Sequence, residues 1–202
     1  NVDNFTLISS DKAVNPSNIM GATKRISELI LINLRNKNIK TNFSIVRFGN
    51  VLNSSGSVVK LFREQLNEGG PILVRDRNVT RYFMTIEEAS QLVIQASSMS
   101  GGADIFLLEM GSPVKIIDLA KKIIELSGMT LKNKKNPNGD IEIKITGLKL
   151  GEKIHEELYI NKEITKTNHP KIYIVNETNL GLIDLDLKLK KLKDYLKENN
   201  LR

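Results

Sequence analysis

The chain has no cysteine and no tryptophan, and only 2 of its 202 residues are histidine. Without cysteine there can be no disulfide, no thiolate nucleophile and no cysteine-based metal site, and a reducing cytoplasmic setting is the default expectation. His155 and His169 lie far apart and lack the spacing of a His-Glu-x-x-His motif. We therefore expect no metal site and no Ser/His/Asp catalytic set.

Long apolar runs and aromatic residues are also scarce. No run approaches the roughly 18 apolar residues that a membrane-spanning helix needs, and the first residues lack the pattern of a signal peptide. Aromatic residues make up 5% of the chain and are not interleaved with the basic residues, so we expect no nucleic-acid partner. The net charge of +7 suits an anionic ligand or an acidic membrane surface equally well.

A glycine-rich phosphate-binding turn is missing as well. A dinucleotide-binding fold needs a Gly-x-Gly-x-x-Gly turn between its first strand and helix, where the backbone approaches the pyrophosphate. Gly49, Gly56 and the pair Gly69-Gly70 lack that spacing and context. The first strand also follows almost directly after Asn1, so we expect this chain to be the C-terminal part of a longer protein.

What is present is an alternation of short apolar runs and amphipathic stretches, which predicts a mixed α/β fold. Strands are expected at Phe5–Ile8, Asn42–Phe48, Ile72–Val74, Ile105–Glu109, Ile141–Ile145 and Ile172–Val175. Helices are expected at Ser17–Lys37, Ser57–Glu68, Ile86–Ser97 and Val114–Ser127. The stretch Leu131–Gly139 has the composition of an exposed loop, and the tail from Asp184 predicts a helix with a leucine face and a solvated lysine face.

The helix expected at Ser17–Lys37 has apolar residues at the spacing of a face packed on a sheet. These residues are Ile19, Ala22, Ile26, Leu29, Ile30 and Leu34. Pro16 suits the start of this helix, and Ser17 or Asn18 can cap it.

The most informative segment links the first strand to this helix. The run Phe5–Ile8 is of the kind that a buried parallel strand shows, and its end releases Ser10, Asp11 and Lys12 together. In open α/β sheets, ligands bind just beyond such carboxyl ends. Met20 and Lys24 then lie four residues apart on one face of the following helix, so both can face the same crevice. This is the layout of a catalytic loop, although Asp11 and Lys12 by themselves would also fit a structural salt bridge.

From Ser9 to about Leu158, the chain resembles the CapD-like polysaccharide-biosynthesis branch of the nucleotide-sugar dehydratases and epimerases, within the extended short-chain dehydrogenase/reductase class. Beyond the catalytic loop, the resemblance is carried by Val46–Leu52, Ser55–Val59, Gly69–Pro71, Arg81–Ile86, Gly111–Lys115 and Thr146–Lys153. It implies the C-terminal part of a Rossmann-like doubly wound parallel sheet plus a small α/β substrate-binding subdomain. Residues 1–50 would complete the NAD(P)-binding domain, and residues 51–202 would mainly bind a UDP-sugar, with returns to the Rossmann-like sheet.

The resemblance implies a UDP-N-acetylglucosamine 4,6-dehydratase that uses NAD or NADP. In such a reaction, Lys12 would remove the C5 proton of the sugar, Asp11 would protonate the departing C6 hydroxyl, and Ser10 would hydrogen-bond the C4 hydroxyl. A lysine base must lose its charge before it can accept that proton. Lys24 would hold the nicotinamide ribose. Cofactor contacts are expected from Ser9, Ser10, Lys24 and Phe48.

Met20 stands where the wider class has the tyrosine of a Tyr-x-x-x-Lys pair. A thioether cannot ionise, so the role of that tyrosine has either moved to Ser10 and Asp11 or been lost. Long, membrane-associated members of the resembling branch carry Met here and remain dehydratases, which favours relocation. The alternative is that Met20 fills the core of an inactive paralogue.

The substrate contacts are also implied by the resemblance. Asn50 and Arg81 would bind the diphosphate, Lys149 and Glu152 the nucleotide, and Ser55, Ser57 and Val59 would line the uridine side. At position 149 the family has arginine, and lysine keeps the charge but loses the fork geometry.

Two other functions remain open. A 4-epimerase of the same class would return the hydride to C4, but simple epimerisation has no need for a C5 base such as Lys12. A non-catalytic UDP-sugar-binding module would explain both the missing glycine turn and Met20. The expected partners are a UDP-sugar, an N-terminal nicotinamide-binding region with a membrane-spanning part in long members, and a second copy of the chain contacted through Ile26, Leu29 and Ile30. The expected location is the cytoplasm or the cytoplasmic face of the inner membrane.

Overall fold

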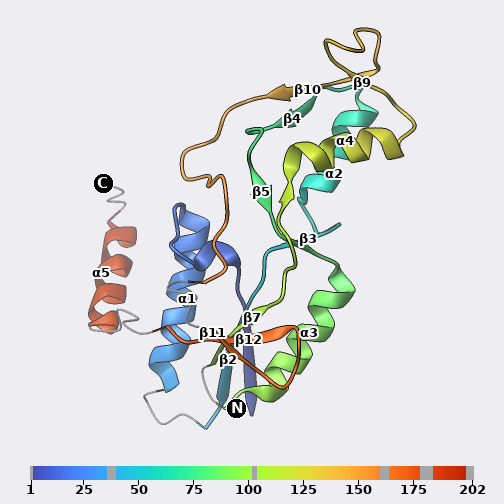
Figure 1. The fold of residues 1–202 in the computed structure, drawn as a ribbon. Coiled ribbons are helices and arrows are strands. Elements are labelled where there is room, and N and C mark those ends of the chain that lie inside the picture. Colours follow the sequence, from blue (N-terminus) through green and yellow to red (C-terminus); the bar gives the residue numbers. More distant parts are fainter. Residues whose placement is uncertain (1, 36–39, 102–103, 160–163, 178–183, 199–202) are drawn as a thin grey trace.

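The fold is described from a computed structural model, which covers residues 2–35, 40–101, 104–159, 164–177 and 184–198. Two sheets lie at opposite ends of an elongated molecule, and short strand pairs connect them (Figure 1). The architecture is therefore mixed α/β, as the sequence pattern predicts.

The larger sheet has the strand order β1-β2-β7-β12-β11. β1 (Asn4–Ile8), β2 (Asn42–Arg47) and β7 (Asp104–Leu108) are parallel, whereas β12 (Ile172–Val175) and β11 (Ile164–Lys166) continue the sheet in antiparallel fashion. β11 was not expected from the sequence. Three exposed residues, among them two polar ones, do not show the apolar alternation from which strands are recognised.

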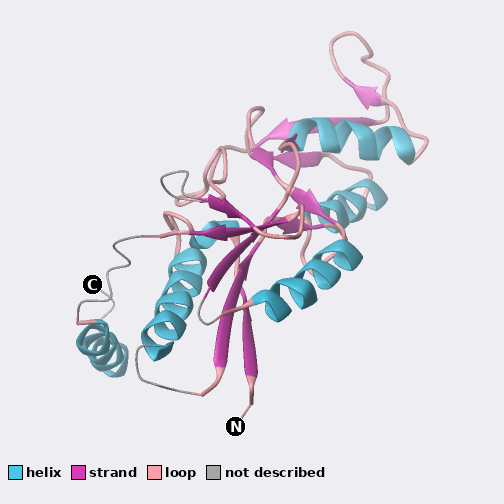
Figure 2. Cartoon of the chain, turned by 60° about the horizontal axis from the view of Figure 1, so that its bottom comes forward, coloured by secondary structure: helices cyan, strands magenta, loops and turns pink. Residues whose placement is uncertain are grey.

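Helices cover both faces of this sheet (Figure 2). α3 (Ile86–Met99) packs on the face that carries Val46 and Phe106, whereas α1 (Ile19–Arg35) packs on the face that carries Ile45. Because both faces are covered, the central strand β2 is buried at five successive residues, as expected for a parallel strand between two helical layers.

Two expectations about the first strand and the first helix were wrong. β1 lies at the edge of the sheet, so Phe5 and Ile8 are 45% and 43% exposed rather than buried. α1 turns Glu28, Leu31 and Ile32 toward the interior. The spacing of apolar residues does not reveal this face, because Glu28, a carboxylate in an ion pair, lies on it.

The apolar face expected for α1 is accordingly only half-buried along most of its length. Ile19 is 84% exposed, and Ile26, Leu29 and Ile30 are half-buried. Asn18 caps the helix, since its Oδ1 accepts a hydrogen bond from Gly21 N at 2.9 Å. The expected end of the helix at Lys37 lies outside the described residues.

The smaller sheet has the order β4-β10-β9, with all three strands parallel. β4 (Ile72–Val74) and β10 (Ile141–Ile145) pack under α2 (Val58–Asn67) and α4 (Ile116–Leu126) around Phe62, which is 1% exposed. β9 (Leu131–Lys132) falls inside the expected loop, a correction of the prediction. It forms because Asp140 Oδ2 accepts two hydrogen bonds from Thr130, each of 2.7 Å, and so holds the chain beside β10.

Two strand pairs join the sheets. β3 (Asn50–Val51) pairs with β6 (Phe83–Met84), and β5 (Thr80–Arg81) pairs with β8 (Val114–Lys115). The helix expected from Val114 therefore begins only at Ile116, because its first two residues pair with β5. A short 3-10 turn, η1 (Asp11–Ala13), follows β1.

The C-terminal helix α5 (Leu185–Lys197) lies beside α1 (Figure 1). Its lysines are exposed, as expected. Its leucine face is exposed in part as well, since Leu192 and Leu196 are 42% and 60% exposed. Within the described ranges, no helix combines the length and the apolar character needed to span a bilayer.

Candidate functional site

The polar triplet at the carboxyl end of β1 is held in place by the neighbouring strand. The amide of Asp11 donates to the carbonyl of Phe48 at 3.1 Å, which extends the β1–β2 ladder past the strand end. Ser10 then caps η1, with its Oγ accepting from Lys12 N at 3.2 Å and donating to Asp11 Oδ1 at 2.9 Å. The three side chains are thereby fixed as one cluster.

Lys12 is the centre of this cluster. Its Nζ lies 2.8 Å from Asp11 Oδ1, 3.1 Å from Asn50 Oδ1 and 4.0 Å from Glu156 Oε1. The Lys12 side chain is 21% exposed, whereas Asp11 is fully buried and its Oδ2 has no hydrogen-bond partner among the described residues. Lys12 and Ser10 therefore stand between Asp11 and solvent.

A pocket of about 410 Å³, here called the smaller pocket, opens in front of the cluster. Many of the expected site residues line it, and these are Ser10, Lys12, Met20, Asn50, Ser55, Ser57 and Val59. Met20 is 49% exposed and offers no proton to this pocket, since its thioether is at most a weak acceptor. Ser10 and Lys12 are the two members of the cluster that present a hydroxyl and an amino group to this pocket.

The four residues expected at the cofactor differ in accessibility. Ser10 lines the smaller pocket, and Lys24 reaches back along α1 to donate from Nζ to the carbonyl of Ile8 at 3.0 Å. Phe48 packs partly buried against the core under α3. Ser9 is buried and donates to Glu28 Oε1 at 2.6 Å. Ser9 is therefore closed to a ligand, whereas Ser10, Lys24 and Phe48 are partly exposed.

A buried ion network lies behind the cluster, and sequence reasoning missed it. Arg47 donates from Nε and Nη2 to Glu28 at 2.8 and 2.6 Å and also pairs with Glu177, while Arg25 lies 2.7 Å from Glu177. Arg47 and Glu28 are fully buried. No sequence signal could have found the pairing, because its members come from β2, α1 and the segment after β12.

The charges in this network stabilise one another. Burial opposes the charged form of Arg47, but hydrogen bonds to Glu28 and Glu177 outweigh it and hold the pKa of Arg47 above its usual value. Burial likewise opposes ionisation of Glu177, but the hydrogen bond and the charge of Arg47, with that of Arg25, hold the Glu177 pKa below its usual range. Arg47 and Glu177 therefore stay ionised, and the network fixes the ends of β1 and β2 through Ser9 and Arg47.

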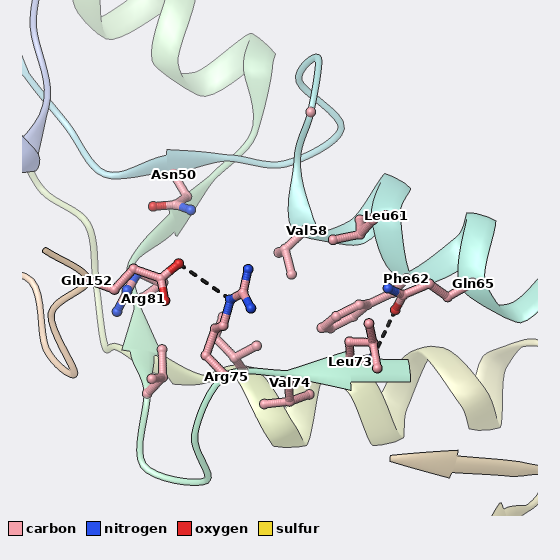
Figure 3. Close-up of a pocket in the computed structure, with 13 residues that line it drawn as sticks. Asn50, Val58, Leu61, Phe62, Gln65, Leu73, Val74, Arg75, Arg81 and Glu152 are labelled. Atoms are coloured by element: carbon pink, nitrogen blue, oxygen red, sulfur yellow. Dashed lines mark hydrogen bonds and ion pairs between the residues drawn. The ribbon is translucent and has the colours of Figure 1, made fainter. Parts of the chain in front are cut away.

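A second pocket of about 480 Å³, here called the larger pocket, adjoins the first and shares Asn50, Gly56 and Val58 with it (Figure 3). Its apolar side is formed mainly by α2 and β4. Its polar side carries the expected residues Asn50, Arg81 and Glu152, and also Arg75, which was not expected.

Arg75 could have been found from the sequence by the same reasoning that singled out Ser10, because it directly follows the strand Ile72–Val74. Glu156 had no comparable signal. It lies in an irregular segment, and its contacts with Lys12 and Arg81 depend on the fold.

The segment 146–157 links the larger pocket to the loop between η1 and α1. Its Gly151 carbonyl accepts a hydrogen bond from Ser17 Oγ at 2.8 Å, and Lys153 Nζ donates to the carbonyl of Val14 at 3.1 Å. Glu152 accepts from the backbone amide of Lys149 at 2.7 Å, whereas the Lys149 side chain is exposed and lines neither pocket. The structure thus brings Glu152 to the site but leaves Lys149 outside it. Among the described residues, no cluster of His, Asp and Glu has the makings of a metal site.

Comparison with known proteins finds relatives that are similar to this chain over most of its length. CapD, a capsular polysaccharide biosynthesis protein of Staphylococcus aureus, is 52% identical over 170 residues, which cover 84% of this chain and 26% of CapD. A UDP-N-acetylglucosamine 4,6-dehydratase (inverting) of Campylobacter jejuni is 31% identical over 182 residues, covering 89% of this chain and 50% of that enzyme. The chain spans only about a quarter to a half of the length of the curated relatives it matches.

Solved structures show the same Rossmann-like fold. The structure of Pen from Bacillus thuringiensis matches with a TM-score of 0.75 and 33% identity, over 87% of this chain and 54% of that one. A variant of UDP-glucuronic acid 4-epimerase from Bacillus cereus, solved with NAD and a fluorinated UDP-sugar, matches with a TM-score of 0.62 and 18% identity, over 79% and 54% of the two chains.

The family comparison covers most of the chain, including both sheets and both pockets. The model of the family described as polysaccharide biosynthesis protein matches residues 1–177. The chain belongs to the polysaccharide biosynthesis protein family.

Proposed function

We propose that this chain is the substrate-binding and acid–base part of an NAD(P)-dependent UDP-N-acetylglucosamine 4,6-dehydratase. The observation that carries the proposal is the cluster of Ser10, Asp11, Lys12 and Asn50, which stands at a parallel strand end and faces a pocket. A lysine there serves elimination better than epimerisation, because only elimination requires removal of the C5 proton. The 31% identity to a Campylobacter jejuni 4,6-dehydratase supports the same choice.

The roles follow from which groups reach the smaller pocket. Lys12 Nζ, in its uncharged form, accepts the C5 proton of the sugar, and Asn50 orients that nitrogen through the 3.1 Å hydrogen bond. Asp11 is buried, so it would exchange protons with the pocket through the Ser10 hydroxyl, which contacts both Asp11 and the pocket. By this route Asp11 would take the proton of the C4 hydroxyl as hydride leaves C4, and would later supply that proton to the departing C6 hydroxyl. Water leaves, and the double bond forms between C5 and C6.

The nicotinamide cofactor, when bound, would accept hydride from C4 and return it to C6, and Lys12 would give its proton back to C5. Lys24 and Ser10 fit the nicotinamide-ribose end of NAD or NADP, since both lie at the carboxyl end of β1. Ser9 donates its hydroxyl proton to Glu28, so it would hold the end of β1 in place rather than contact the cofactor. Because the thioether of Met20 cannot ionise, Ser10 is the residue that hydrogen-bonds the C4 hydroxyl.

We further propose that the rest of the cofactor is held by a nicotinamide-binding region of the same protein. β1 is an edge strand of the described sheet, with Phe5 and Ile8 nearly half exposed. Added parallel strands on this edge would cover these side chains and extend the sheet toward a doubly wound fold. Assembly with a second copy through Ile26, Leu29 and Ile30 and a cytoplasmic location remain predictions.

The proposal is tested by incubating the protein with UDP-N-acetylglucosamine and NAD or NADP and measuring the mass of the product by mass spectrometry. A UDP-sugar lighter by one water supports dehydration. An isomer of unchanged mass would show an epimerase instead. UDP-sugar binding without any product, even when the nicotinamide-binding region is supplied, would show a non-catalytic module.

A further inference from the structure

We propose that Glu156 is a positioning residue for the proton transfer assigned to Lys12. The inference rests on the proposed function, because that function supplies the role of Lys12. Glu156 lines neither pocket, so it acts through Lys12 and not by contact with the substrate. Its side chain is 5% exposed, and among the described residues its Oε2 atom has no hydrogen-bond partner. Leaving a buried carboxylate oxygen without a partner costs free energy, so its presence here calls for an explanation.

The Oε1 atom of Glu156 faces two cations that belong to different pockets. It lies 4.0 Å from Nζ of Lys12, a residue of the smaller pocket, and 3.6 Å from Nε of Arg81, a residue of the larger pocket. Both distances suit a charge pair but exceed the length of a hydrogen bond. The carboxylate can therefore attract both groups without occupying an N–H donor of either.

Arg81 is the fixed member of this arrangement. Its Nη1 donates to the carbonyls of Thr80 at 2.7 Å and Ile154 at 3.1 Å, and its Nη2 donates to the carbonyl of Lys153 at 2.9 Å. Because a guanidinium has five N–H donors, one on Nε and one on Nη2 remain for a ligand. Arg81 thus holds the segment that carries Glu156 and stays able to bind a phosphate.

Further contacts place Glu156 between β5 and η1. On one side, the backbone amide of Thr80 donates to the carbonyl of Ile154 at 3.0 Å. On the other side, Lys153 Nζ donates at 3.1 Å to the carbonyl of Val14, the residue that follows η1. The carboxylate is therefore held by the chain on both sides and does not depend on Lys12 for its position.

The direction of the Lys12 lone pair is what this carboxylate can control. Lys12 Nζ donates to Asp11 Oδ1 at 2.8 Å and to Asn50 Oδ1 at 3.1 Å. Once Lys12 has lost a proton, its two remaining N–H groups match these two acceptors. The negative charge of Glu156, 4.0 Å away, repels the lone pair. Glu156 thereby turns the lone pair away from itself and toward the smaller pocket, which Lys12 lines.

The same position predicts an effect of opposite sign on ligand binding. A carboxylate 3.6 Å from Arg81 opposes an anion at that guanidinium. Because three carbonyls hold Arg81, it stays in place when the charge of Glu156 is removed. Glu156→Gln keeps the shape of the side chain, so it should lower turnover and leave UDP binding at least as tight as in the wild-type protein. Loss of a purely structural contact would weaken both.

The test combines kinetics, calorimetric titration with UDP and thermal unfolding, all on the intact protein. Glu156→Gln should lower kcat for water elimination from UDP-N-acetylglucosamine by roughly 10- to 100-fold, the scale expected when a reacting group is misplaced. In a Lys12→Ala background the same substitution should cause no further loss of kcat, because it acts through Lys12. Glu125→Gln is the matched control and should equal the wild-type protein, since Glu125 is 70% exposed and lines neither pocket.

The possible results separate this inference from the proposed function. A fall in kcat that is absent from the Lys12→Ala background, with UDP affinity retained or raised, supports the inference. Unchanged kcat in Glu156→Gln overturns it and leaves the dehydratase standing, and so does a further loss of kcat in the Lys12→Ala background. A joint fall in kcat, UDP affinity and unfolding temperature also overturns it, because it shows a structural role. A wild-type protein that gives no lighter UDP-sugar overturns both.

Discussion

The carboxyl ends of the parallel strands in the two sheets carry the two halves of the candidate site, and these halves are built in opposite ways. At the larger sheet, Asp11 and Lys12 are buried or nearly so and are paired with each other within 2.8 Å. At the smaller sheet, Arg75 and Glu152 are 40% and 31% exposed and are joined by a looser pair of 3.4 Å. A closed, internally paired cluster suits proton transfer at fixed geometry, whereas an exposed cation beside an apolar pocket suits ligand capture.

The largest effect is expected from removing the proton acceptor of the closed cluster. Lys12→Ala should lower kcat for water elimination by roughly 10²- to 10⁴-fold, the usual contribution of a general base. UDP affinity should stay near the wild-type value, because Lys12 lines the smaller pocket and not the larger one. Asp11→Asn should also lose turnover with binding retained. Steady-state kinetics measures kcat, and titration with UDP measures the affinity. Normal turnover by Lys12→Ala would show that Lys12 is not the proton acceptor.

The next largest effect should come from the ion network behind the cluster. Arg47→Ala removes the partner of buried Glu28 and of Glu177, and stranding a buried charge costs about 3–5 kcal/mol in free energy of unfolding. Lys122→Ala is the control, because the Lys122–Glu125 pair is 60% and 70% exposed and should contribute at most ~1 kcal/mol. Urea denaturation of both variants makes the comparison. Equal midpoints would mean that the network does not stabilise the strand ends.

Disrupting the contact between Gly151 and Ser17 should have an intermediate effect on KM and on stability. A Cβ at Gly151 would come within 2.6 Å of the Ser17 carbonyl oxygen, and φ there is +81°. Gly147 has a similar φ of +84° but open space around it, so Gly147→Ala carries the backbone strain without the clash. We expect Gly151→Ala to raise KM for the UDP-sugar more than Gly147→Ala does, with a stability cost of about 1–3 kcal/mol. Similar KM values would show that the segment 146–157 need not touch α1.

The smallest effect concerns pH. The pKa of Glu177 is held below its usual range, so its ion pairs contribute stability that is present above the unfolded-state pKa and is lost as the pH falls through the lower, folded-state pKa. Unfolding midpoints recorded through the acidic range should therefore fall less steeply for Glu177→Gln than for the wild-type protein. Parallel curves would indicate that Glu177 does not supply this stability.

Much of the fold could be predicted because its cues are local. The apolar runs of β2, β4 and β12 and the amphipathic stretches of α2 and α3 identify their elements without knowledge of their neighbours. The failures share a cause. β9 and β8 form because a distant strand offers backbone partners, and the inward face of α1 is set by Arg47, which approaches Glu28 from β2.

The same division holds for the site. Local sequence determined that Ser10, Asp11 and Lys12 leave a strand together and that a methionine stands four residues before Lys24, because both facts need only the order of residues. Only the tertiary structure decided which side chains can meet a ligand. Asp11 is fully buried, Arg81 donates to carbonyls some 70 residues further along, and Arg75, which pairs with Glu152, is 40% exposed. Burial and hydrogen-bond saturation depend on what the rest of the chain places beside a residue, and no stretch of sequence contains that by itself.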